Sequence, residues 1–188
     1  MEAMMKQQLT SRLANIILFA VLQNLVEEKW HIFYINLVNN AMERRPEFTI
    51  IAGPNGASKS RLGVFYSSAK AFDGDKLAMN LRKEHKDWKE SWIDGTVIST
   101  LMNEVETAIE QKKSYAFESN FSSDLPINLI QRFKNAGYKI CLVYFGLSSK
   151  EDSLFRVIQR QNMGGHNVSQ DVIEYNFTEG IKRVRASL

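Results

Sequence analysis

A lysine and a serine follow a glycine-containing loop in the stretch FTIIAGPNGASKSRL, residues 48–62. An apolar run typical of a strand stops at Gly53, and Lys59 and Ser60 stand where a helix can begin. A loop that bends at its glycines turns several backbone N–H groups toward a phosphate, and the following helix adds its positive N-terminal end. The spacing therefore predicts a phosphate-binding loop made of Gly53, Asn55, Gly56, Ala57, Ser58, Lys59 and Ser60.

This loop fits the pattern G-x-x-x-x-G-K-[ST] with one exception, because Ser58 stands where the second glycine is expected. In that pattern the lysine reaches the β- and γ-phosphates, and the hydroxyl after it binds Mg²⁺. We expect these roles for Lys59 and Ser60. If position 58 requires a positive φ, serine carries steric strain that glycine avoids. The alternative is a glycine-containing turn that binds no ligand.

Three carboxylates stand at the ends of two predicted strands. Asp73 and Asp75 follow the run 69–72, and Glu118 closes the run 115–118. The carboxyl ends of parallel strands form the functional edge of an α/β sheet. Asp73 or Asp75 can orient a substrate hydroxyl and accept its proton, or reach Mg²⁺ through water. The alternative is a turn in which Asp75 caps the next helix. Glu118 is either a contact to substrate or metal-bound water, or a polar strand terminus.

Two arginines near the C-terminus form a candidate lid. Arg156 and Arg160 lie four residues apart, on one face of a helix predicted over 150–161. The glycine-rich turn 163–168 follows, and it contains His166. Arginines beside such a turn can close over nucleotide phosphates and neutralise charge in the transition state. The alternatives are a surface ion pair for the arginines and a hydrogen bond within the turn for His166.

The order of the predicted elements indicates the fold class. Strands are expected at 48–52, 69–72, 115–118 and 139–147, and helices at 59–66, 96–113, 126–136, 150–161 and 170–184. The run KICLVYFGL is apolar almost throughout, as in a parallel strand covered on both faces. Alternation of strands with helices predicts a doubly wound α/β protein, with a P-loop NTPase-like parallel sheet flanked by helices.

Residues 1–45 precede the phosphate loop and have a different pattern. Apolar residues between positions 9 and 21 recur at three- and four-residue spacing, which predicts an amphipathic helix, and a second helix is expected over 28–42. We therefore predict an N-terminal helical extension, 1–45, before a P-loop kinase-like domain, 46–188. The extension packs on that domain, or binds a partner protein or a second copy of the chain.

Composition limits the cellular setting and the partners. With 188 residues, 44% of them hydrophobic, the chain can bury one good core. The net charge of +3 comes without a long basic block, so a nucleic-acid partner is not expected. The apolar run 13–22 is too short to cross a bilayer, so no membrane association is expected. Cys141 is the single cysteine of the sequence and lies in an apolar run, which fits a reducing, cytoplasmic location.

Several stretches together resemble the zeta-toxin family of P-loop kinases, in particular its compact bacterial branch. They are FTIIAGPNGASKS, FDGD, SYAFESNFSS, GYKICLVYFGL and RVIQRQNMGGHNVSQDVI, and they cover most of residues 48–175. The resemblance implies a kinase that uses ATP or GTP with Mg²⁺, a small-molecule acceptor such as the 3′-hydroxyl of a UDP-N-acetyl amino sugar, and an antitoxin-like partner. It implies Asp75 as the catalytic carboxylate and Arg156 and Arg160 at the transferred phosphate.

Three positions depart from the family pattern. Ser58 replaces a loop glycine, Arg61 replaces a small hydroxyl or apolar residue, and Asn176 stands where a second lid arginine is expected. Arg183 is a candidate to supply that arginine. The departures leave a second hypothesis open: a degenerate nucleotide-binding protein with little turnover that acts on a partner or second copy through residues 1–45.

Overall fold

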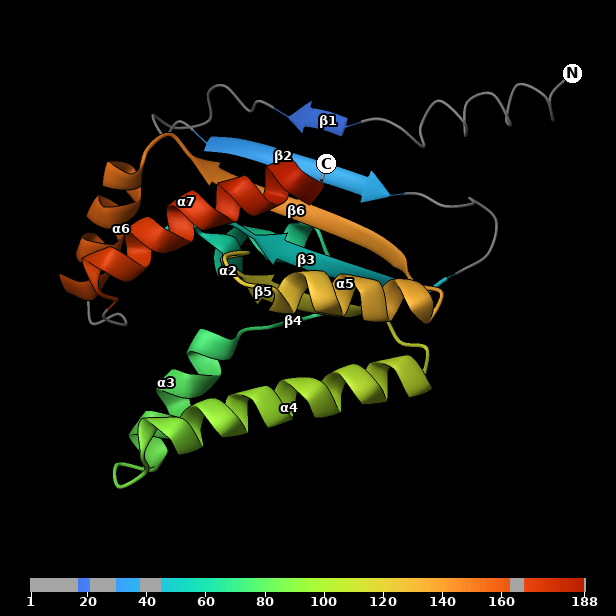
Figure 1. Ribbon diagram of the computed structural model, residues 1–188, viewed down its shortest axis with the longest axis horizontal. Coiled ribbons are helices and arrows are strands. Elements are labelled where there is room, and N and C mark those ends of the chain that lie inside the picture. The colour runs from blue at the N-terminus through green and yellow to red at the C-terminus, as the bar shows by residue number, and fades with distance from the viewer. Residues whose placement is uncertain (1–16, 21–29, 38–44, 163–167, 188) are drawn as a thin grey trace, which may run out of the picture.

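A six-stranded sheet with strand order β1-β2-β6-β3-β5-β4 forms the centre of the protein (Figure 1). The computed structural model describes residues 17–20, 30–37, 45–162 and 168–187. The strands are β1 (Ile17–Ala20), β2 (Trp30–Leu37), β3 (Glu47–Ala52), β4 (Ala71–Phe72), β5 (Tyr115–Ser119) and β6 (Lys139–Leu147). Strands β6, β3, β5 and β4 are mutually parallel, which confirms the predicted α/β class.

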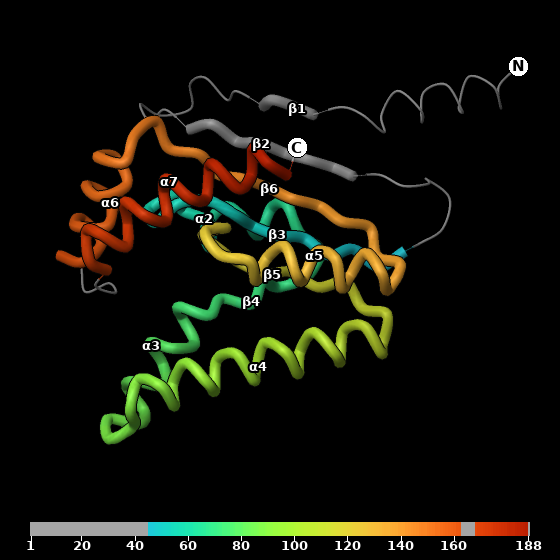
Figure 2. Tube along the Cα trace, in the orientation of Figure 1, coloured from blue at the N-terminus to red at the C-terminus, as the bar shows by residue number. Residues whose placement is uncertain are grey.

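Helices connect the parallel strands, and two more follow β6, the last strand of the chain. They are α2 (Lys59–Leu62), the 3-10 helix η1 (Gly63–Phe65), α3 (Gly74–Glu84), α4 (Glu90–Glu110), α5 (Leu125–Asn135), α6 (Lys150–Asn162) and α7 (Gln170–Ser187). The trace shows α3 and α4 on the side of the sheet that β4 borders (Figure 2). Helix α4 begins at Glu90 rather than at the expected residue 96. Within the described ranges, no helix is long and apolar enough to span a bilayer.

Strand register brings the predicted site residues to one edge of the sheet. Ala52 at the end of β3 lies opposite Ser119 of β5 and Tyr144 of β6. Phe72 of β4 lies opposite Phe117 of β5. The chain therefore leaves β3, β4 and β5 at the same edge, and the loops that follow these strands are neighbours.

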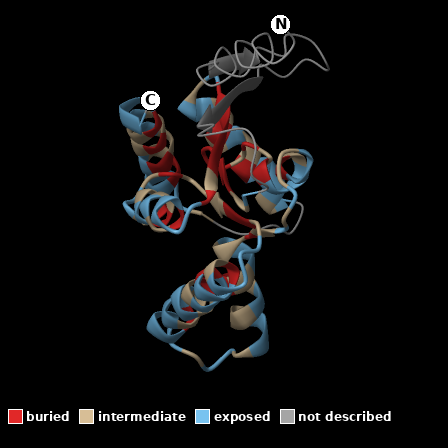
Figure 3. Ribbon diagram, turned by 90° about the vertical axis from the view of Figure 1, so that its right-hand side faces the viewer, coloured by how far each residue is buried: buried red, intermediate tan, exposed pale blue. Residues whose placement is uncertain are grey.

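The central strands are buried on both faces, as their apolar runs predict. On one face, Phe48 stacks on Phe133 of α5 with ring centroids 4.0 Å apart, within a cluster that also includes residues of α4 and α7. On the other face, Ile51 and Phe145 pack with Leu62 and other residues of the chain. Buried residues accordingly concentrate in the sheet and on the inner faces of the helices (Figure 3). This core holds the strand ends, and with them the loops, in fixed relative positions.

The predicted N-terminal helices are wrong at residues 17–20 and 30–37, which form strands β1 and β2. β2 pairs antiparallel with β6, and β1 with β2, so both extend the sheet. The segment WHIFYINL is rich in aromatic and β-branched residues, which favour strands, and β6 offers it an unpaired edge. Short apolar segments fit helical and strand periods almost equally well, so spacing alone misassigned them. The other residues before position 45 lie outside the described residues.

We expect removal of residues 1–38 to lower the midpoint of chemical denaturation and to increase self-association. The deletion leaves the β6 edge without its β2 partner, and an exposed apolar edge strand pairs readily with other chains. Removal of residues 1–16, which keeps both β1 and β2, is the matched control. Denaturation curves and size-exclusion chromatography measure both effects. A 39–188 fragment as stable and as dispersed as the full chain would contradict the role of β2.

Candidate functional site

The loop after β3 has the backbone that the sequence pattern predicts. Gly53 has φ +147°, and a Cβ there would lie 2.4 Å from the Phe145 carbonyl oxygen. Its N–H donates to the Ser119 carbonyl of β5, at 3.2 Å. Gly56 has φ +79°, and a Cβ there would lie 3.0 Å from the Arg156 Cβ of α6. The phosphate loop (residues 53–60) is therefore enclosed by β5, β6 and α6, too closely for side chains at positions 53 and 56.

Ser58 adopts the left-handed backbone conformation that the missing glycine would adopt easily. Its φ is 55° and its ψ is 29°, immediately before α2. The Ser58 carbonyl accepts hydrogen bonds from the N–H groups of Arg61 and Leu62, at 3.1 and 3.0 Å, so the conformation starts the helix. A residue with a Cβ is disfavoured there by about 1–2 kcal/mol. The condition under which serine carries steric strain at position 58, a positive φ, is met in the structure.

The Lys59 side chain is 8% exposed and points back toward the start of the phosphate loop. Its Nζ donates to the carbonyl oxygens of Gly53 and Pro54, at 2.9 and 3.1 Å, and to the Asn120 Oδ1, at 2.9 Å. Burial lowers the pKa of Lys59, and the nearby carboxylates of Glu118, Asp75 and Asp73 oppose that change in this order. The ammonium is thus held between the loop and a group of negative charges.

Those carboxylates meet Lys59 in one cavity of about 210 Å³. Asp73, Asp75 and Glu118 line it, as the sequence predicts from the ends of their strands. An apolar wall faces them, formed by Phe72, Val97, Leu101 and Phe117. We call this space the carboxylate cavity. It combines a lysine next to the phosphate loop with proton-accepting groups and room for a small organic molecule.

The helix cap in this region differs from the expectation. Asp73, not Asp75, precedes α3 as its cap, and its carboxylate accepts a hydrogen bond from the Lys76 N–H at 2.9 Å. Asp75 lies in the first turn of α3 and its side chain is exposed. A carboxylate engaged in capping is held in position, whereas an exposed one can bind a substrate hydroxyl. Of the two aspartates, Asp75 is therefore the better placed to accept a proton.

Glu118 is half-buried next to the other charges of the carboxylate cavity. Burial is the largest influence and raises the pKa of its carboxyl group, and Asp73 and Asp75 raise it further. Lys59 and a hydrogen bond with the Ser60 hydroxyl lower this pKa, but burial prevails. Glu118 and Ser60 are therefore neighbours, which joins the strand end to the start of α2.

The side chains around Ser60 suit a hard divalent cation. Hydroxyl and carboxylate oxygens are the ligands that Mg²⁺ prefers, and it usually keeps several waters and binds substrate phosphates as well. Among the described residues, no group of three or more His, Cys, Asp or Glu side chains can hold an ion by itself. Ser60 and Glu118, which are hydrogen-bonded to each other, are the residues that could hold such an ion together with phosphate oxygens.

Helix α6 places the two predicted lid arginines near the phosphate loop. The Ser153 Oγ of α6 donates to the Asn55 carbonyl at 2.6 Å, which fixes the helix over the loop. Arg156 then lies against Gly56, and the charge of Arg160 is close enough to lower the pKa of Lys59. Contact of these guanidinium groups with a transferred phosphate stays a prediction. His166 lies outside the described residues.

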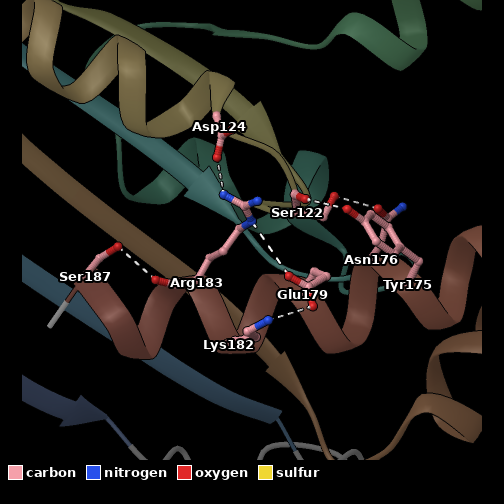
Figure 4. Close-up of polar contacts among 8 residues, drawn as sticks. All are labelled: Ser122, Asp124, Tyr175, Asn176, Glu179, Lys182, Arg183 and Ser187. Carbon is pink, nitrogen blue, oxygen red and sulfur yellow. Dashed lines mark hydrogen bonds and ion pairs between the residues drawn. The ribbon is translucent and has the colours of Figure 1, made fainter.

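Helix α7 contributes an asparagine to the site, not an arginine. The Asn176 Nδ2 donates to the Asn55 Oδ1 at 2.9 Å. The Asn176 Oδ1 accepts from the Ser122 Oγ at 2.6 Å (Figure 4). The Arg183 guanidinium binds Asp124 at 2.5 Å and lies 3.9 Å from Glu179. The idea that Arg183 replaces the lid arginine is therefore wrong in this structure, because the arginine is held at the start of α5 instead.

Sequence reasoning missed the roles of several polar residues around the loop. Asn120 stands two residues after the predicted strand 115–118, at the strand end where ligand-binding groups are expected, so its contact with Lys59 had a local signal in the sequence. The bond between Asn55 and Asn176 joins residues 121 positions apart and had none. The other residues missed in this way are Ser122 and Ser153.

Comparisons with known proteins support the fold. No family model matches the chain. A protein of Haemophilus influenzae, described as uncharacterized, is 27% identical over 127 residues, which cover 66% of this chain and 88% of that protein. A chain in the structure of the Pnkp1/Rnl/Hen1 RNA repair complex matches with a TM-score of 0.59 and 16% identity, over 78% of this chain. The match covers 48% of that chain, about half of its length. This likeness shows a shared α/β fold.

We expect the Ser58→Gly variant to be more stable than the parent protein by about 1 kcal/mol, because glycine adopts a positive φ without the Cβ clash. Ser58→Ala, which keeps a Cβ, is the matched control and gains nothing of this kind. Urea denaturation measures the difference in free energy of unfolding. Equal stability of Ser58→Gly and Ser58→Ala would show that position 58 carries no strain.

We expect Glu118→Gln to change how stability depends on pH. The folded protein keeps a proton on Glu118 at pH values where the unfolded chain has lost it, since the folded pKa is raised. The free energy of unfolding of the parent therefore falls as pH rises from the ordinary glutamate pKa through the folded pKa. The variant lacks this fall, so it matches the parent near pH 4 and exceeds it at pH 7.

Denaturation at a series of pH values measures this difference, with Glu110→Gln on the exposed side of α4 as the matched control. A gap between variant and parent that stays the same from pH 4 to pH 7 would contradict the raised pKa.

Proposed function

We propose that this chain is a P-loop kinase of the zeta-toxin type, which transfers a phosphoryl group from ATP or GTP to a hydroxyl of a small-molecule acceptor. The observation that carries the proposal is the meeting of Lys59, Asp73, Asp75 and Glu118 in one cavity beside the phosphate loop. The glycine-restricted loop, the parallel sheet and the match to a chain of an RNA repair complex support it.

The nucleotide phosphates bind in the phosphate loop in this proposal. Backbone amides of the loop contact phosphate oxygens, and the Lys59 ammonium exchanges one or more of its carbonyl bonds for them. When bound, Mg²⁺ supplies positive charge at the β- and γ-phosphates, with Ser60 as its protein ligand. Arg156 and Arg160 on α6 neutralise charge on the transferred group. Catalysis by this arrangement depends mainly on positioning and on charge stabilisation.

The acceptor occupies the carboxylate cavity. Asp75 orients its hydroxyl and accepts the proton as the oxygen forms a bond to the γ-phosphorus and the bond to the β-phosphate oxygen breaks. Asp73, Glu118 and His166 contact the acceptor or its bound water. The zeta-toxin resemblance makes a UDP-N-acetyl amino sugar the first acceptor to test. An antitoxin-like partner or a second copy of the chain, bound through residues 1–45, remains part of the proposal.

We expect Lys59→Ala and Asp75→Asn to reduce turnover strongly and in different ways. Lys59→Ala removes the ammonium at the phosphates, so nucleotide affinity falls and turnover drops by about 10²–10³-fold. Asp75→Asn keeps nucleotide affinity but loses the proton acceptor, which costs about 10²–10⁴-fold. Lys70→Ala and Asp87→Asn, two exposed residues outside the cavity, are the matched controls. Nucleotide consumption is measured with UDP-sugars, nucleosides and an RNA oligonucleotide as acceptors.

Three outcomes would count against the proposal. Turnover that survives both substitutions would remove the site, and phosphorylation of the RNA in preference to every small molecule would replace the acceptor class. Nucleotide binding without turnover would favour a degenerate binding protein, a hypothesis supported by the strained Ser58 and by Asn176 in place of an arginine. A large gain in rate in Ser58→Gly would show instead that the serine limits an existing enzyme.

A further inference from the structure

Asn55 in the phosphate loop is held by two different helices. Its side chain is fixed from α7, because the Asn55 Oδ1 accepts a hydrogen bond from the Asn176 Nδ2 at 2.9 Å. Its backbone is fixed from α6, because the Asn55 carbonyl accepts from the Ser153 Oγ at 2.6 Å. Asn55 is 6% exposed, Asn176 7% and Ser153 0%. Hydrogen bonds this deeply buried define the orientation of their groups, since an unpaired alternative is costly.

Asn176 is itself anchored on its other side. Its Oδ1 accepts from the Ser122 Oγ at 2.6 Å, in the connection between β5 and α5, and the Tyr175 hydroxyl donates to the Ser122 carbonyl at 3.4 Å (Figure 4). Gly180, one turn further along α7, packs so closely that a Cβ there would lie 2.6 Å from the Asn120 carbonyl. Asn120 in turn accepts from Lys59. Helix α7 is thus fixed both to Asn55 and to the strand end that holds the lysine.

We propose that Asn176 is a positioning residue for the nucleotide phosphates: through Asn55 it sets the direction of the backbone amides that follow in the phosphate loop. That the ligand is a nucleotide phosphate rests on the proposed function. Gly56 and Ser58 both have positive φ, and such backbone persists only where its surroundings fix it. Asn55 directly precedes Gly56 and stands three residues before Ser58, so its bond to Asn176 restrains the start of the strained part of the loop.

An asparagine suits this position better than the expected arginine. Asn176 uses its amide as a donor toward Asn55 and its carbonyl as an acceptor from Ser122. Arginine has donors only, so it cannot accept the hydrogen bond from Ser122, and its charge would be buried. The departure from the family pattern at position 176 is therefore an alternative way of fixing the loop, and not simply a lost lid residue.

The test compares phosphate affinity in Asn176→Ala with that in Arg183→Ala. Both changes remove a contact of α7 with the rest of the protein, but Arg183 binds Asp124 and not the loop. We expect ATP and inorganic tripolyphosphate to bind Asn176→Ala about tenfold more weakly, the effect of one lost buried hydrogen bond. Arg183→Ala keeps the parent affinity. Isothermal titration calorimetry measures the affinities, and melting temperatures identify a general loss of stability.

A double-mutant cycle isolates the bond itself. If Asn176 acts through Asn55, the double variant Asn55→Ala, Asn176→Ala binds tripolyphosphate no more weakly than the weaker single variant. Ser122→Ala is a smaller change than Asn176→Ala, because it removes only the hydrogen bond to the Asn176 Oδ1. The Asn176 side chain is then less well fixed, and we expect phosphate affinity to fall about threefold. Ser122→Ala is the variant to measure if Asn176→Ala does not fold. Three results would overturn the inference. The first is an affinity within twofold of the parent in both Ser122→Ala and Asn176→Ala. The others are a loss of affinity in Arg183→Ala as large as in Asn176→Ala, and additive effects in the cycle.

Hydrogen exchange separates this inference from the proposed function. If the parent protein binds neither ATP nor tripolyphosphate, the kinase proposal fails, while exchange at amides 56–60 still tests the restraint without any ligand. We expect these amides to exchange faster in Asn176→Ala and at the parent rate in Arg183→Ala. Unchanged exchange in Asn176→Ala overturns the positioning role.

Discussion

The buried ammonium of Lys59 is the charge around which this site is built. Burial removes this charge from water, which is unfavourable and lowers the pKa of Lys59. Three oxygen acceptors and three nearby carboxylates offset that cost. Two of the acceptors are carbonyls of the phosphate loop and the third belongs to Asn120 at the end of β5. The same ion therefore shapes the loop, connects it to the neighbouring strand and keeps acidic groups nearby. A triphosphate would find a cation already in place.

Parallel pairing supplies the geometry that this charge requires. β3 lies between β5 and β6, and its last residue, Ala52, lies opposite the last residue of β5. Lys59 and Asn120, which are 61 residues apart in the chain, therefore meet at one edge. The core beneath them is closely packed on both faces, so the strand ends cannot move independently. The polar contacts of α6 and α7 then complete the enclosure from the C-terminal part of the chain.

The sequence predicted the features that depend on residues close together in the chain. The loop, Lys59 and the carboxylates at the strand ends were found because strand periodicity, glycine and charge mark them within a few residues. The pattern marked position 58 as one where a positive φ would strain a serine, but only the structure shows that φ is positive there. Trp30–Leu37 was misassigned because its state depends on a partner strand, β6, that lies far along the chain. The contact of Asn176 with Asn55 was beyond prediction, since only the folded arrangement of α7 creates it.

The antiparallel pairing of β2 with β6 has a consequence for how the chain reaches its final form. Trp30 meets Leu147, a partner more than one hundred residues later, so closing this part of the sheet carries a large loop-closure entropy. On the ribosome, β2 is made long before β6 emerges and must wait for it. A segment rich in aromatic and β-branched residues that waits in this way is exposed to other chains, so aggregation competes with folding until β6 is made.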